Sequence, residues 1–294
     1  MPNIPSNALQ ALLAAGFWGM GDFSGGMSAK SAPGNLSPVG VGVRVVLYSH
    51  LTSFSVLVLL ALTRHGDFPH GAALAWGLGA GVLAGFSLAA FYVALSRGAM
   101  GASAAISGLL AAGVPAGVTF AAQGSPGPHR LLGFLIAGVA IWLIAAGPAV
   151  EEARSTILLA SAAGVGFGLY FVALKFASAD AGPLWTMVTA RFGSITTCAA
   201  ILLLLNLSSP NAKGSRISRR MKVWILSTAL FDTSGNLMFV ISTQSGRLDI
   251  ASVLASFYPA GTILLAAGVL HERLTPRQIT GMGIAVAAVA LITL

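Results

Sequence analysis

The chain has 294 residues, of which 56% are hydrophobic and only 8% are charged, whereas an average soluble domain carries about 25% charged residues. With a mean hydropathy of +0.85, this composition excludes a soluble domain and indicates a multi-pass membrane protein. The net charge of +8 does not indicate nucleic-acid binding, because the basic residues are scattered singly or gathered in one short loop, RISRRMK. Such a loop is typical of positive-inside topology.

Hydropathy, together with glycine, proline and charge breaks, predicts ten membrane-spanning helices joined by short loops. The segment before the first helix, MPNIPSN, has no basic residues, so we expect that helix to be a retained span and not a cleaved signal. Thr275 and Pro276 predict the start of the last helix, since threonine caps free amides and proline suits the first helical position. The predicted spans are residues 8–27, 36–62, 72–96, 99–122, 131–150, 157–177, 184–207, 223–242, 251–270 and 277–294.

The second half of the chain weakly repeats the first at a nearly constant offset. At 149 residues Gly19 meets Gly168 and the pair Ser103 and Ser107 meets Ser252 and Ser256; Gly133 meets Gly281 at 148, and Arg44 meets Arg191 at 147. Residues 1–150 and 151–294 are therefore predicted to be two five-helix repeats. Because five is odd, the second repeat enters the membrane from the opposite side. The predicted fold is an all-α membrane protein with two inverted five-helix repeats around a central cavity.

Two motifs near the C-terminus carry a family resemblance. They are SFYP at residues 256–259 and GVLHERLTPRQITG at residues 268–281. They resemble the end of an EamA-type transporter of the drug/metabolite transporter superfamily, although His271 replaces a glycine of the family pattern. The resemblance implies a secondary transporter whose cavity is lined by helices one, three, four, six, eight and nine. Members of this family move amino acids, sugars, nucleotide sugars or drug-like compounds, often outward.

Four charged residues fall well inside predicted spans: Asp22, Arg44, Arg191 and Asp232. At the bilayer centre each costs on the order of 3 kcal/mol, so each is expected to face the protein interior or water and to have a partner. One interpretation is that they form structural ion pairs between helices. The other is that Asp22 and Asp232 line the cavity, where a carboxylate binds a cationic substrate or exchanges a proton. The sequence leaves both open.

The surroundings of the two carboxylates favour a binding cavity. Helical spacing places Asn236 and Phe239 on the face of Asp232, and Trp18 on the face of Asp22. The cavity would be aromatic, dotted with hydroxyl groups, and acidic if Arg44 and Arg191 point elsewhere; it would suit an amphipathic or cationic solute. The candidate substrate-binding residues are Trp18, Asp22, Phe86, Tyr92, Ser103, Ser107, Phe167, Phe171, Asp232, Asn236, Phe239, Ser252, Ser256 and Tyr258.

Two prolines are predicted to interrupt helices four and nine, namely Pro115 and Pro259. Broken helices at matching positions of two repeats point to a binding site near the midplane. On the peripheral second helix, His50 is expected to pack or hydrogen-bond internally. Cys198, the single cysteine, is expected to pack in the core.

The loop charges bear on orientation. Four basic residues lie in the loops on the side of the amino terminus and ten in the opposite loops, which favours both termini outside the cytoplasm. The family resemblance implies the reverse. The protein is expected in the plasma membrane, which is the inner membrane of a bacterium. The four are Arg64, Arg130, Lys175 and Arg247, and the ten are Lys30, Arg97, Arg154, Lys213, Arg216, Arg219, Arg220, Lys222, Arg273 and Arg277.

The leading functional prediction is a transporter that exports a small organic metabolite or drug-like solute by alternating access, with an amino acid or organic cation favoured. An uptake permease for a sugar-like solute is the alternative. An intramembrane enzyme is remote: GMGD at residues 19–22 superficially matches the GxGD motif of aspartyl proteases, but LFDTSGN around Asp232 lacks the second motif. We expect no cofactor, no metal and no nucleic acid. The expected partners are the lipid bilayer, a small-molecule substrate and protons, with the protein a monomer or homodimer.

Overall fold

The computed structural model describes residues 5–32, 37–64, 67–97, 100–145, 154–208, 218–271 and 273–294. Within these ranges every regular element is an α-helix, and eight helical stretches are long and apolar enough to cross a membrane. The protein is therefore a multi-pass membrane protein, as its composition predicted. The helices are α1 (Ser6–Lys30), α2 (Pro38–Thr63), α3 (Gly71–Arg97), α4 (Met100–Gln123), α5 (Pro128–Ala145), α6 (Arg154–Ser208), α7 (Arg219–Ser245), α8 (Leu248–Ala255), α9 (Tyr258–Leu270) and α10 (Pro276–Thr293).

The long element α6 consists of two helices separated by a kink. Gly182 has φ 65° and ψ 173°, a conformation outside the helical region. Glycine adopts a positive φ without steric cost, and the following Pro183 cannot donate a backbone hydrogen bond, so the helix ends there and a new one begins. The kink lies in the gap that hydropathy predicted between residues 177 and 184.

The helices around the two prolines behave differently. A break at Ser256 and Phe257 separates α8 from α9, with Pro259 in the first turn of α9. The predicted interruption at Pro259 is therefore confirmed. The predicted interruption at Pro115 is wrong, because α4 continues through it. The proline lacks the N–H that would bond the Ala111 carbonyl, and a membrane helix tolerates the loss of this one hydrogen bond without ending.

The last helix begins as predicted. Thr275 is the N-cap of α10, its side chain accepts a hydrogen bond from the Gln278 amide, and Gln278 reaches back to the Thr275 amide at 2.9 Å. Pro276 occupies the first helical position, where its missing N–H would have no partner. This capping box fixes the residue at which α10 begins.

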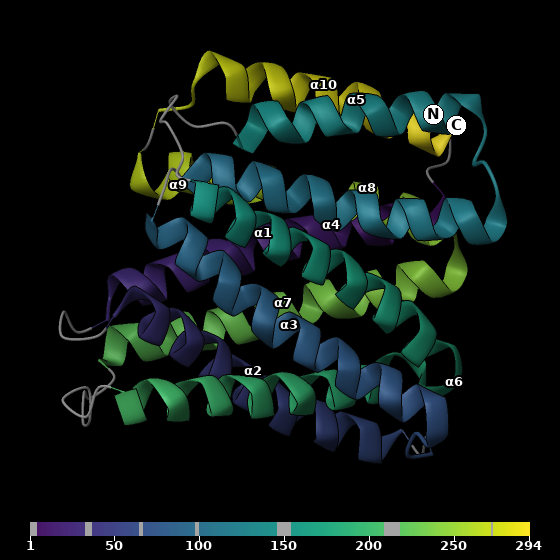
Figure 1. Ribbon diagram of the computed structural model, residues 1–294. Helices are drawn as coiled ribbons and strands as arrows, with labels where there is room; N and C mark the ends of the chain where they lie inside the picture. The colour runs from purple at the N-terminus through teal and green to yellow at the C-terminus, as the bar shows by residue number, and fades with distance from the viewer. Residues whose placement is uncertain are drawn as a thin grey trace.

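Small residues let the central helices approach closely. A Cβ atom at Gly19 of α1 would lie 2.9 Å from the backbone of α9 at Tyr258 and Gly261, so only glycine fits there. Such contacts drive helix association where lipid removes the hydrophobic force. α5 and α10 pack together along one edge of the molecule (Figure 1). The centre of the bundle is left to α1, α3, α6, α7 and α9, which surround a cavity.

Candidate functional site

The cavity has a volume of about 480 Å³ and lies among α1, α3, α6, α7 and α9. On α1 the lining residues Trp18, Asp22, Gly26 and Lys30 recur every four residues, so one face of that helix runs along the whole cavity. At the far end the wall includes Leu270 of α9 and Gln278 of α10. The end that carries Lys30, Leu270 and Gln278 is called the mouth below.

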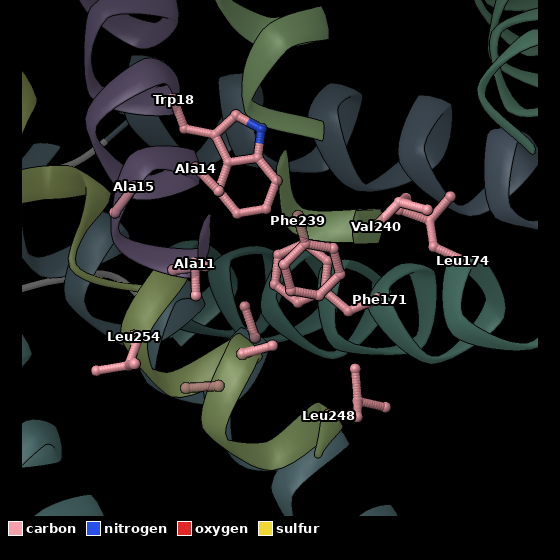
Figure 2. Close-up of a cluster of buried hydrophobic side chains, with 14 of the residues drawn as sticks. Ala11, Ala14, Ala15, Trp18, Phe171, Leu174, Phe239, Val240, Leu248 and Leu254 are labelled. Atoms are coloured by element: carbon pink, nitrogen blue, oxygen red, sulfur yellow. The ribbon is translucent and has the colours of Figure 1, made fainter. Parts of the chain in front are cut away.

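Aromatic rings form the floor of the cavity. Trp18 of α1 stacks on Phe171 of α6 with ring centroids 5.3 Å apart and planes within 5°, and Phe171 contacts Phe239 of α7 at 4.5 Å. Tyr258 of α9 meets Trp18 edge-on at 6.4 Å. Figure 2 shows the rings of Trp18, Phe171 and Phe239 gathered beside Ala11, Ala14 and Ala15 of α1. The floor is therefore an apolar plug that joins four helices.

On the side of the floor away from the mouth, hydrogen bonds to backbone oxygens hold neighbouring helices together. The Lys175 ammonium donates to the carbonyl of Thr243, and the Gln244 side chain donates to the carbonyl of Ser178 at 2.9 Å. These bonds join the first part of α6 to the end of α7. The hydroxyl of Ser242 donates to the Asn7 carbonyl at 2.7 Å and so ties α7 to the start of α1.

One wall of the cavity holds an ion pair between a buried arginine and a partly exposed carboxylate. The Arg191 guanidinium of α6 donates to one carboxylate oxygen of Asp232 on α7 at 2.5 Å, and Asn236 donates to the other at 3.1 Å. Tyr170 then donates to the Asn236 amide oxygen at 2.6 Å. Both carboxylate oxygens of Asp232 are therefore occupied by donors. This arrangement corresponds to the ion-pair interpretation of Asp232.

His50 extends this network from α2. The Arg191 guanidinium, which can only donate, lies 2.8 Å from Nε2 of His50, so Nε2 accepts and the ring proton resides on Nδ1. Nδ1 is 2.8 Å from the hydroxyl of Ser194. His50 is thus internally hydrogen-bonded, as expected, but it also reaches the cavity wall.

Asp22 has very different surroundings. It lines the cavity and is exposed there, while its neighbours Gly21 and Phe23 are buried. Within the described residues it forms no salt bridge. Since Arg191 faces the cavity and neutralises Asp232, the condition that this arginine points elsewhere fails. Among the described residues that line the cavity, Asp22 is therefore the carboxyl group without a basic partner.

Some of the other candidate residues line the cavity, some are buried behind its wall, and others lie away from it. Phe167 and Tyr258 also line the cavity, and Tyr258 hydrogen-bonds to the side chain of Ser107. Phe86 is 61% exposed and does not line the cavity, while Arg44 bonds the Gly40 carbonyl near the start of α2. The side chain of Tyr92 is outside the described residues. The candidates buried behind the cavity wall are Ser103, Ser107, Phe239, Ser252 and Ser256.

Several lining residues were not among the candidates, notably Lys30, Phe91 and Tyr170. Lys30 lies two four-residue steps after Asp22 and Tyr170 three residues after Phe167, so helical spacing could have found both. Phe91 carries no such signal. Among the described residues, no group of three or more metal-ligating side chains could hold a metal ion.

Comparison with known proteins agrees with the C-terminal motifs. Residues 154–294 match the model of the EamA-like transporter family. A solved structure titled "Crystal structure of protein" superposes with a TM-score of 0.75 over 98% of this chain and 96% of that chain; at 16% sequence identity, this likeness shows the fold alone. No curated protein matches the chain. Residues 154–294 therefore carry the signature of the EamA-like transporter family, which supports a transporter of the drug/metabolite transporter superfamily, and the apolar helices make the chain a multi-pass membrane protein.

Proposed function

We propose that this transporter carries a small amphipathic organic cation by alternating access. The observation that carries the proposal is Asp22, a carboxylate exposed in an aromatic cavity and without a salt bridge in the described part of the chain. Aromatic faces and a carboxylate both attract a positive charge. A volume of about 480 Å³ lies within the usual range for small-molecule sites.

The charge distribution favours an organic cation over a zwitterionic amino acid. An amino acid also needs a donor for its own carboxylate, and the Arg191 guanidinium is engaged by Asp232 and His50. Lys30 lies at the mouth, eight residues from Asp22, which is about 12 Å along a helix. At that separation the two side chains form no salt bridge, so Lys30 does not pair with Asp22.

We further propose that the chain forms ten spans in two inverted repeats, residues 1–150 and 151–294. A reciprocal contact between α5 and α10 supports this. A Cβ atom at Gly133 of α5 would meet Ile292 of α10, and one at Gly281 of α10 would meet Ile144 of α5. Adding 148 to the numbers of α5 converts each pair into the other. Such reciprocity is what a two-fold axis between the halves produces.

A second pair of contacts supports the same axis. Gly19 of α1 faces the backbone of α9 at Tyr258 and Thr262, while Gly168 of α6 faces α4 at the Leu110 carbonyl and Val114. Gly168 follows Gly19 by 149 residues, and the two contacts on α9 follow those on α4 by 148. The α1–α9 contact is therefore equivalent to the α6–α4 contact.

The mouth lies on the basic side of the protein. Lys30 lines the mouth, and Ser28 on the same end of α1 donates to the Met221 carbonyl beside Arg219 and Arg220. Under the positive-inside rule this side is cytoplasmic. In this state the cavity is open to the cytoplasm, the side from which an exporter loads its substrate. Because an uptake permease with alternating access also opens to that side, export stays a prediction.

The two other functions receive less support. Sugars also stack on aromatic rings, but a sugar would leave the Asp22 carboxylate without a counter-charge. An aspartyl protease needs two carboxylates that share a site. Both oxygens of Asp232 are occupied by Arg191 and Asn236, so Asp232 is not available as the second acid.

Counterflow in proteoliposomes tests the proposal. A panel of organic cations, amino acids and sugars would be tested with the wild type, Asp22→Asn, and Asp180→Asn, which neutralises an exposed aspartate outside the cavity. We expect saturable exchange of cations, lost in Asp22→Asn and kept in Asp180→Asn. Exchange of sugars alone, or cation exchange that Asp22→Asn leaves intact, would contradict it.

A further inference from the structure

Two aromatic pairs in the centre of the helix bundle are related by the proposed internal repeat. Trp18 and Phe239 form one pair in the floor, with ring centroids 5.5 Å apart. Phe167 and Phe91 form the other at 5.9 Å, and both line the cavity. Phe167 follows Trp18 by 149 residues and Phe239 follows Phe91 by 148. These are the offsets of the helix contacts, so the pairs occupy equivalent positions.

The third member of each set differs. In the floor, Phe171 completes the cluster, since its ring stacks on Trp18 and contacts Phe239. The residue 149 positions earlier is Asp22. Phe91, Phe167 and Asp22 are therefore two rings and a carboxylate, whereas the equivalent floor residues Phe239, Trp18 and Phe171 are three rings. The all-aromatic set is packed shut, and the set with the carboxylate faces the open cavity.

We propose that Phe91, Phe167 and Asp22 form a second gate, which lies between the floor and the mouth and closes the path to the mouth only when a cation neutralises Asp22. In the closed gate Asp22 would occupy the place that Phe171 has in the floor, against two aromatic rings. A bare carboxylate there loses its water without gaining a partner, which strongly disfavours closure. A bound cation removes this penalty. Asp22 thus both selects the substrate and permits the conformational change.

This gate explains how a carrier avoids closing empty. The floor needs no such control, because Trp18, Phe171 and Phe239 are uncharged and pack in the absence of a ligand. The inference rests on the proposed inverted repeat and on alternating access. It does not depend on which cation is carried, so it can be tested without a substrate.

Cysteine accessibility tests the gate directly. In a Cys198→Ala background, Ala266→Cys reports on the mouth, where Ala266 lines the cavity, and Ser178→Cys reports on the closed end, where Ser178 is 1% exposed. Each reporter is placed in three proteins, which have the wild-type Asp22, Asp22→Leu or Asp22→Glu. A membrane-impermeant maleimide is then added on the side of the membrane that the reporter faces.

We expect Asp22→Leu to lower the labelling rate at Ala266→Cys about tenfold and to raise that at Ser178→Cys, because loss of the charge shifts the population toward closure of the mouth. Asp22→Glu keeps the charge and should leave both rates near those of the parent. Unfolding would raise both rates, so a reciprocal change identifies the gate. Unchanged rates in Asp22→Leu would overturn the inference even if cation exchange is observed. A reciprocal change without cation exchange would contradict only the proposed substrate.

Discussion

Asp22 and Asp232 lie on adjacent helices, yet their environments differ. The backbones of α1 and α7 approach so closely that a Cβ atom at Gly21 would lie 3.2 Å from the Asp232 amide. Asp232 has a donor on each carboxylate oxygen, from Arg191 and Asn236. Asp22 faces the cavity, and among the described residues no basic group pairs with it. One intramembrane carboxylate is thus stabilised by the fold, while the other has no basic partner among the described residues.

The largest expected effect is the loss of the ion pair. Arg191→Leu removes the counter-charge of the partly buried Asp232 carboxylate, and we expect it to lower the free energy of unfolding by about 3 kcal/mol, the lower end of the range for a buried pair. The double variant Arg191→Leu with Asp232→Leu should recover most of this loss, because it removes both charges. Thermal unfolding in detergent measures both. Equal destabilisation of the single and double variants would show that the pair is not the cause.

A smaller effect is expected in the floor. A Cβ atom at Gly235 would lie 2.5 Å from Cδ1 of Trp18, so Gly235→Ala should displace the indole and cost about 1–3 kcal/mol. Gly16→Ala is a matched control on α1, since a Cβ atom there meets nothing within 4 Å. Tryptophan fluorescence and thermal unfolding report the change. A Gly235→Ala protein as stable as Gly16→Ala would contradict the packing of Trp18 on α7.

A further prediction concerns His50, which accepts a hydrogen bond from Arg191 on the Asp232 side of this comparison. His50→Ala removes the acceptor of one Arg191 N–H, and leaving that donor buried should cost about 1–3 kcal/mol. His50→Gln keeps an acceptor and should cost less. The difference between these variants should shrink in the double variant that lacks Arg191 and Asp232, because the donor is then gone. A difference that persists there would assign His50 a role other than positioning Arg191.

Helical spacing predicted the part of the site that lies on single helices. Trp18 with Asp22, and Asp232 with Asn236, are four residues apart and line the cavity together. The Arg191–His50 contact joins residues 141 positions apart, and no local pattern encodes it.

In a membrane protein, an apolar side chain is as well placed facing lipid as in the core, so hydrophobicity does not reveal burial. Phe86 and Phe91 are equally apolar, so hydropathy does not distinguish the exposed ring from the one in the cavity. Nor does hydropathy show where a hydroxyl group donates its hydrogen bond. Ser252 and Ser256, predicted to bind substrate, donate to backbone carbonyls one turn earlier in their own helix.

The smallest effect on stability is expected where the effect on transport is largest. Asp22→Asn removes a charge that no described basic residue neutralises, so the free energy of unfolding should change by no more than about 0.5 kcal/mol, as at an exposed site. Asp232→Asn weakens the bond to Arg191 and should destabilise the protein measurably. Unfolding of both variants, measured beside cation counterflow, separates the two roles. If Asp22→Asn destabilised the protein as much as Asp232→Asn, Asp22 would be a structural residue, and the cation site would have to be sought elsewhere on the cavity wall.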